Sequence, residues 1–230
     1  MIQIKNLTIG HKDRTLFSSA NFDICEGECI MLCGANGSGK STFAKGLAGV
    51  ISPEKKKEIL EKGIPRCDIF FDKERHMEFD RRVRNTYSIP ESDRIILYAP
   101  TFRADHSIEP YRISWDKVIP ELEKVFKGSG ITVLVRLHPV LIGKVDTSSL
   151  LCCRNVIDAT SYHDMQELLC ISDMLITDYS SSMFDFALQG RPCLLYATDA
   201  NAYDRGFYFD LNELPFPLTE NQEQLLATIE

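Results

Sequence analysis

Residues Gly34 to Ser41 have types and spacing that could bind a nucleotide, because they match the pattern G-x-x-x-x-G-K-S/T. The glycines let backbone N–H groups turn inward around phosphate oxygens, since no Cβ stands in the way. Lys40 would reach the β- and γ-phosphates, and Ser41 would be the Mg²⁺ ligand. The predicted contacts to Mg-ATP are Gly34, Asn36, Gly37, Ser38, Gly39, Lys40, Ser41 and Thr42.

A second set of polar residues lies between positions 100 and 190 and also suits a phosphate-containing ligand. Arg103 offers a planar fork of N–H donors, and His138 could donate to phosphate or transfer a proton. Ser180 and Ser181 precede a predicted helix, where hydroxyls and N–H groups suit a diphosphate. Asp185, further along that helix, is a candidate acceptor for ribose hydroxyls.

The elements that must position this second set alternate between strands and helices over residues 63–230. Apolar and β-branched runs predict strands at 94–99, 131–137, 174–177 and 192–196. Helices are predicted at 115–126, 165–172 and 182–189. The alternation predicts an α/β fold with a parallel Rossmann-like sheet covered on both faces. Ligands of such sheets bind beyond the carboxyl ends of the strands, which selects the loops 100–103, 137–140 and 178–182.

These residues also have purely structural interpretations. Asp178 with Ser180 or Ser181 could only cap a helix, and Asp185 could be an exposed helix acid. A histidine before proline, such as His138, is more often structural than catalytic. We favour a functional site because three strand-end loops all bear phosphate-compatible groups.

The glycine loop has predicted neighbours of its own within residues 1–53. Met1 to Ile9 and Ala20 to Ile24 alternate apolar and polar residues, and Cys29 to Cys33 forms a short apolar strand. A predicted helix from Lys40 to Gly49 follows the loop. This order of elements predicts a partial P-loop NTPase β-β-β-α unit ahead of the larger sheet.

The stretches GECIMLCGANGSGKST and LAGVISP resemble the start of an ABC transporter ATP-binding subunit. The resemblance ends near residue 53, because the signature L-S-G-G-Q, the glutamine loop and the switch histidine are missing. The nearest match to a Walker B strand, Met174 to Asp178, is followed by Tyr179 and not by glutamate. ATP hydrolysis is therefore not expected, whereas Mg-ATP binding stays open.

The pattern changes at Ser52 and Pro53, after which residues 54–62 form a predicted charged junction helix closed by Gly63. No Gly/Ser-rich linker is found there. We interpret this segment as a fusion joint between residues 1–53 and 63–230. The alternative is an ABC-type helix with an unusual continuation.

Five motifs follow one another in the second part: GIPRCD (63–68), ILYAPTFR (96–103), VRLHP (135–139), ELLCISDMLITDYSSSMFDFALQGRP (167–192) and RGFYFDL (205–211). In this order they resemble the nucleotide-binding half of the CDP-glycerol glycerophosphotransferase family. The resemblance implies the donor lobe of a GT-B transferase that builds poly(glycerophosphate) teichoic acid. In that family an acceptor hydroxyl attacks the β-phosphorus of CDP-glycerol and CMP is released.

The resemblance also implies roles for individual residues. His138 would be a catalytic or diphosphate-binding histidine. The contacts to the CDP-glycerol donor would be Arg103, Thr177, Asp178, Ser180, Ser181 and Asp185. An acceptor lobe with a second histidine has no counterpart before Gly63, and a final helix would be expected beyond Glu230. We therefore expect donor binding with weak or absent turnover.

The composition of the chain excludes several classes of binding partner and predicts its location. The net charge is −7, and residues 1–53 carry five Lys/Arg against four Asp/Glu, so no basic half exists to bind nucleic acid. Eight cysteines without a signal peptide predict reduced core thiols, a cytoplasmic protein and no structural metal. No apolar run reaches the ~18 residues of a membrane span, so any membrane association would be peripheral, at the inner face.

Two other hypotheses remain. One is an ATP-binding component of an ABC-type polysaccharide or teichoic acid exporter, with exporter subunits as partners. The other is an inactive binding fragment. Under the leading hypothesis the partners are a nucleotide-activated polyol phosphate and a lipid-linked polymer acceptor, and the choice between glycerol and ribitol stays open.

Overall fold

The computed structural model describes residues 2–11, 14–24, 65–151, 153–203 and 210–229. The predicted strand at 29–33, the glycine loop with all eight predicted ATP contacts, and the junction helix at 54–62 lie outside these residues. The chain divides into two compact units, residues 1–63 and 64–230, which are described separately.

In the first unit, β1 (Ile2–His11) pairs with β2 (Arg14–Ile24) in an antiparallel hairpin. The register runs from Ile2 opposite Ile24 to His11 opposite Arg14, with irregularities between Ile4 and Gly10. The strand predicted at 20–24 therefore begins earlier, at Arg14. Backbone pairing extends to His11 and Arg14. The alternation of side chains alone does not reveal this extent.

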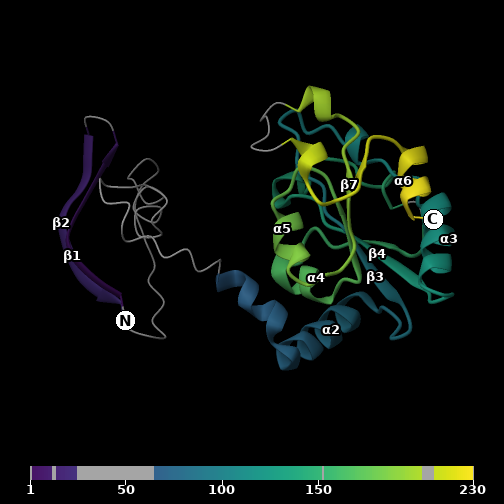
Figure 1. The fold of residues 1–230 in the computed structure, drawn as a ribbon, viewed down its shortest axis with the longest axis horizontal. Helices are drawn as coiled ribbons and strands as arrows, with labels where there is room; N and C mark the ends of the chain where they lie inside the picture. The colour runs from purple at the N-terminus through teal and green to yellow at the C-terminus, as the bar shows by residue number, and fades with distance from the viewer. Residues whose placement is uncertain (1, 12–13, 25–64, 152, 204–209, 230) are drawn as a thin grey trace. The chain divides into compact units, whose positions relative to one another are not determined.

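The second unit contains a six-stranded sheet in the order β5-β4-β3-β6-β7-β8, in which every neighbouring pair is parallel (Figure 1). The strands are β3 (Arg94–Tyr98), β4 (Ile131–Val135), β5 (Val156–Asp158), β6 (Met174–Thr177), β7 (Cys193–Tyr196) and β8 (Leu218–Thr219). The predicted parallel α/β sheet is confirmed. The two edge strands β5 and β8 were not predicted from the sequence.

Helices cover both faces of this sheet, with α4 and α5 on one side and α3 and α6 on the other (Figure 1). The α-helices are α2 (Lys73–Tyr87), α3 (Trp115–Val125), α4 (Met165–Ile171), α5 (Ser182–Ala187) and α6 (Gln222–Ile229). Short 3₁₀ helices are η2 (Pro65–Phe71), η3 (Glu109–Tyr111), η4 (Pro139–Leu141), η5 (Ala200–Ala202) and η6 (Leu211–Glu213). In the described part of the chain, every helix is too short or too polar to cross a membrane.

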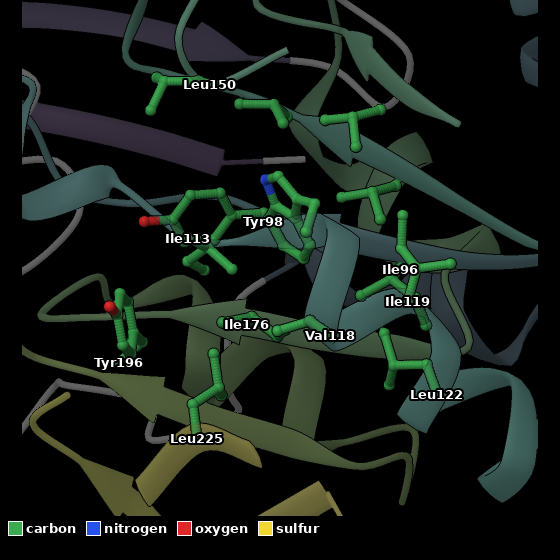
Figure 2. Packing of buried hydrophobic residues seen from close by; sticks show 14 of the residues in the cluster. Ile96, Tyr98, Ile113, Val118, Ile119, Leu122, Leu150, Ile176, Tyr196 and Leu225 are labelled. Atoms are coloured by element: carbon green, nitrogen blue, oxygen red, sulfur yellow. The ribbon is translucent and has the colours of Figure 1, made fainter. Parts of the chain in front are cut away.

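Successive residues of each strand point to opposite faces of the sheet, so the core has two apolar layers, one on each face. On one face, Ile96, Tyr98 and Ile176 pack with α3 and with Leu225 of α6 (Figure 2). On the other face, Ile95, Leu97, Leu134 and Leu175 pack with buried residues of α2, α4 and α5. Since both faces are apolar, polar side chains gather where the strands end.

Candidate functional site

A pocket of about 380 Å³ opens at the carboxyl edge of the sheet in the second unit. Its walls come from the loops that follow β3, β4 and β6, together with residues from η2, the start of α4 and α5. The lining residues are Arg66, Ala99, Pro100, Thr101, Arg136, Leu137, His138, Pro139, Met165, Gln166, Ser180, Ser181, Ser182 and Asp185. Segments of all three predicted loops therefore meet in one pocket.

Four of the predicted site residues line this pocket: His138, Ser180, Ser181 and Asp185. Thr177, Asp178 and Arg103 are buried outside its lining. The Thr177 hydroxyl donates to the Ala99 carbonyl over 2.7 Å and so ties the end of β6 to the end of β3. The contacts predicted between a CDP-glycerol donor and Arg103, Thr177 and Asp178 stay predictions.

Arg103 is held between two carboxylates. Its Nη1 donates to Asp178 Oδ2 over 2.9 Å, and its Nε and Nη2 donate to the Asp199 carboxylate over 2.6 and 2.7 Å. Nη1 also donates to the Thr101 carbonyl, and the guanidinium lies 4.9 Å from the centre of the Tyr179 ring. Burial lowers the pKa of Arg103, but the hydrogen bonds and the charges of both aspartates outweigh burial and raise it.

Asp178 and Ser180 have different roles from a simple helix cap. The Asp178 carboxylate accepts the backbone N–H of Thr101 over 2.8 Å, which joins the loop after β6 to the loop after β3. Ser180 Oγ accepts from the Ser182 hydroxyl over 2.8 Å and from the Ser182 N–H over 3.3 Å. The turn before α5 is thus organised by Ser180, while Asp178 fixes the neighbouring loop.

His138 follows β4 and is exposed in the pocket wall. Its Nδ1 accepts the backbone N–H of Val140 over 3.2 Å, and its ring lies 4.7 Å from that of Phe102, measured between centroids. An Nδ1 that accepts a hydrogen bond carries no proton, so Nε2 is the protonated nitrogen of the neutral imidazole. This tautomer suits donation of a hydrogen bond from Nε2 to a ligand oxygen.

Sequence reasoning missed two arginines of the pocket, Arg66 and Arg136. Arg136 follows β4, and its Nη2 donates to the Tyr162 carbonyl over 3.0 Å. The described residues give its guanidinium no ion pair. Burial lowers the pKa of Arg136 and outweighs the charge of Asp164, which raises it. The motif VRLHP contained a signal for Arg136, because a charged residue directly after a buried strand must lie at the ligand edge.

Three buried polar atoms of the pocket lack a hydrogen-bond partner among the described residues: Thr101 Oγ1, Arg136 Nε and Gln166 Oε1. Two further atoms of this kind, in Trp115 and Gln222, belong to side chains outside the pocket lining. Buried polar atoms are nearly always paired, because an unpaired one costs about 1–3 kcal/mol. Three of the five atoms of this kind in the described residues thus lie in the wall of this one pocket.

A larger pocket of about 870 Å³ lies at the opposite, amino edge of the sheet. Three of its four arginines have partners within the fold. Arg84 pairs with Asp80 over 2.9 Å, and Arg94 pairs with Asp173 over 2.9 Å. Arg191 donates to the carbonyls of Cys170 and Ser172 over 2.8 and 2.7 Å. None of the unpaired buried side-chain atoms found in the described residues belongs to its lining. We therefore take the pocket at the carboxyl edge as the candidate functional site, in agreement with the ligand position typical of parallel sheets.

Comparison with known proteins identifies the family. The model of the CDP-Glycerol:Poly(glycerophosphate) glycerophosphotransferase family matches residues 39–230, and the chain belongs to this family. The match begins inside the glycine loop and covers the whole second unit.

Two similar curated proteins are named as teichoic acid enzymes. The teichoic acid glycerol-phosphate transferase of Staphylococcus aureus is 35% identical over 178 residues, which are 75% of this chain and 44% of that protein. The teichoic acid poly(glycerol phosphate) polymerase of Bacillus subtilis is 34% identical over 179 residues, which are 75% of this chain and 24% of that protein. The chain thus spans less than half the length of these relatives.

The fold matches a solved relative. The structure of the wall teichoic acid polymerase TagF superposes with a TM-score of 0.59 at 33% identity, over 76% of this chain and 43% of that one. A TagF variant soaked with CDPG superposes with a TM-score of 0.57. The α/β fold predicted from the sequence is therefore also the fold of this family.

Proposed function

We propose that the second unit binds CDP-glycerol in the pocket at the carboxyl edge of its sheet, and that the protein takes part in glycerol phosphate transfer for teichoic acid synthesis. The observation that carries this proposal is the charge of the pocket, in which Arg66 and Arg136 outnumber the single lining carboxylate, Asp185. His138 and the hydroxyls of Ser180 and Ser181 line the same pocket. Its volume of about 380 Å³ lies in the range of small-molecule sites.

The proposed chemistry is phosphoryl transfer. An acceptor hydroxyl attacks the β-phosphorus of CDP-glycerol, a new P–O bond forms, and the bond to the α-phosphate oxygen breaks. CMP leaves with the electron pair, and the acceptor hydroxyl gives its proton to a base. Because catalysis of such transfers is mainly electrostatic, the Arg136 guanidinium and the Nε2–H of His138 suit the charge that develops on the leaving CMP.

The named relatives support glycerol as the polyol and a polymer as the acceptor, since two of them are a glycerol-phosphate transferase and a poly(glycerol phosphate) polymerase. A ribitol-phosphate polymerase is also similar, at 29% identity. CDP-ribitol is therefore the right competitor in any binding test. A lipid-linked acceptor would bring the protein to the inner face of the cell membrane.

The test is calorimetric titration of the full chain with CDP-glycerol, CDP-ribitol, UDP-glucose and Mg-ATP. We expect CDP-glycerol to bind best and Arg136→Met to weaken its binding about tenfold or more, the usual loss for a hydrogen bond from a charged group. Arg81→Met is the matched control, because Arg81 is exposed and lines the pocket at the amino edge. Binding of Mg-ATP alone, or equal affinity in Arg136→Met, would contradict the proposal.

A further inference from the structure

The carboxylate of Asp185 is fully engaged by the protein. Oδ2 accepts from Arg66 Nε over 2.8 Å and from Gln166 Nε2 over 3.1 Å. Oδ1 accepts from Arg66 Nη2 over 3.2 Å and from the Cys67 thiol over 3.4 Å. A carboxylate offers about four acceptor positions, so these donors occupy its capacity. Asp185 therefore has little left with which to accept hydroxyls of a ribose.

The Arg66–Asp185 pair is unequal in exposure. The Asp185 side chain is 8% exposed, whereas the Arg66 side chain is 46% exposed. Burial raises the pKa of Asp185, but the hydrogen bonds from Arg66, Gln166 and Cys67 outweigh burial and lower it. The aspartate is thus a buried, charged anchor, and the arginine is the partner that a ligand can reach.

Arg66 has donors to spare. A guanidinium carries five N–H groups, and the Asp185 carboxylate takes one from Nε and one from Nη2. Among the described residues, no acceptor is found for Nη1, and Arg66 lines the pocket. The bidentate hold on Nε and Nη2 fixes the plane of the guanidinium, so its remaining donors have a defined direction.

The charge of the pocket favours an anion. Asp185 is the one carboxylate among the lining residues, and it is paired with Arg66. Arg136, which lies in the loop after β4, donates to the Tyr162 carbonyl and forms no ion pair within the described residues. The two arginines therefore give the pocket more positive than negative charge, as a diphosphate ligand requires.

We propose that Arg66 is a phosphate-binding residue of the donor pocket and that Asp185 is its positioning residue, not a ribose ligand. This inference rests on the proposed function, because it takes the ligand to be a CDP-activated polyol phosphate. Arg66 belongs to the first motif of the second unit, GIPRCD, which sequence reasoning left without a role. The Arg66–Asp185 pair gives that motif a chemical function through a contact between residues 119 positions apart.

The experiment compares ligands that differ in one group at a time. Affinities for CDP-glycerol, CMP, 2′,3′-dideoxy-CMP and cytidine are measured by ligand-observed NMR competition, which reaches millimolar dissociation constants. The full chain is used as wild type, Arg66→Met, Arg66→Lys and Asp185→Asn, with Arg81→Met as the control. Arg66→Lys keeps the charge and loses the planar fork, so it also serves if Arg66→Met does not fold.

We expect Arg66→Met to weaken CMP and CDP-glycerol on the order of tenfold to a hundredfold, with cytidine unchanged. Arg66→Lys should recover part of this loss. Asp185→Asn should weaken CMP and dideoxy-CMP alike, because it acts through Arg66. A ribose role predicts the opposite: Asp185→Asn would abolish the preference for CMP over dideoxy-CMP, and Arg66→Met would leave the phosphate contribution intact.

These outcomes separate the inference from the function on which it rests. If the wild type binds nucleotides and both Arg66 variants bind them with the same affinity, the inference about Arg66 is wrong and the proposed function stands. A wild type that binds no cytidine nucleotide would overturn the proposed function and the inference together. Selective loss of the phosphate-containing ligands supports both.

Discussion

Arg103 and Asp178 form an ion pair of 2.9 Å behind the pocket, with side chains only 8% and 2% exposed. The pair joins the loop after β3 to the loop after β6, and Asp178 strengthens the junction by accepting the Thr101 N–H. Asp199 holds the same guanidinium from a third loop. Two residues predicted to contact a donor thus set the geometry of the wall in front of them.

Asp178→Ala should lower the free energy of unfolding of the second unit by about 3 kcal/mol, because it leaves a buried arginine with one carboxylate fewer. Urea unfolding followed through Trp115 measures this, since Trp115 is the only tryptophan and is completely buried in that unit. Glu91→Ala, at an exposed position, is the control. Unchanged stability together with lost CDP-glycerol affinity would instead make Asp178 a direct ligand contact.

The pH dependence of stability should reflect Asp199. Burial raises the pKa of Asp199, but hydrogen bonds from Arg103 and Tyr179 outweigh burial and lower it. The unfolded chain, with a carboxyl pKa of about 3.9, therefore binds more protons near pH 4 than the folded one. The stabilisation is present above that pH and is lost as the pH falls through the lower, folded pKa.

Asp199→Asn should accordingly flatten the fall of the unfolding free energy between about pH 5 and pH 3. Urea unfolding at a series of pH values measures the slope. Asp116→Asn is a suitable control, because Asp116 is exposed. An equal slope in wild type and Asp199→Asn would show that the Arg103–Asp199 pair does not govern acid stability.

Much of the fold was predictable from local pattern, and the exceptions have physical causes. The central strands and the helix α3 have apolar runs long enough to show a period, while α4 and α5 were predicted as short helices between strands. The edge strands β5 and β8 have three and two residues, too few to show one. In α2, only Phe79 and Val83 of 15 residues are buried, so its pattern is mostly polar.

The site was predictable as a position and less so as a set of contacts. The strand-end rule located the loops that bear His138, Ser180 and Ser181. It could not show that Arg103 is paired with Asp199, a partner 96 positions away. Nor could it show that Arg136 lacks a carboxylate partner in the described residues, because that depends on where the acids lie in the folded unit.

Thr101→Val should separate binding from stability. Thr101 Oγ1 is buried without a partner among the described residues, so replacing the hydroxyl with a methyl group removes an unsatisfied acceptor and donor. We expect the free energy of unfolding to stay the same or to rise, while the Kd for CDP-glycerol increases about threefold to tenfold. A variant that loses stability and keeps its affinity would show that the hydroxyl serves the fold and not the ligand.

His138→Ala should raise the Kd for CDP-glycerol about threefold to tenfold, the usual loss for one neutral hydrogen bond, because the variant lacks the Nε2–H donor. Stability should change little, since His138 is exposed and its bond to the Val140 N–H closes only a local turn. Calorimetry with CDP-glycerol, paired with urea unfolding through Trp115, measures both quantities. If the variant kept both its affinity and any CMP release, His138 would have no part in binding or transfer, and the functional role of the loop after β4 would rest on Arg136.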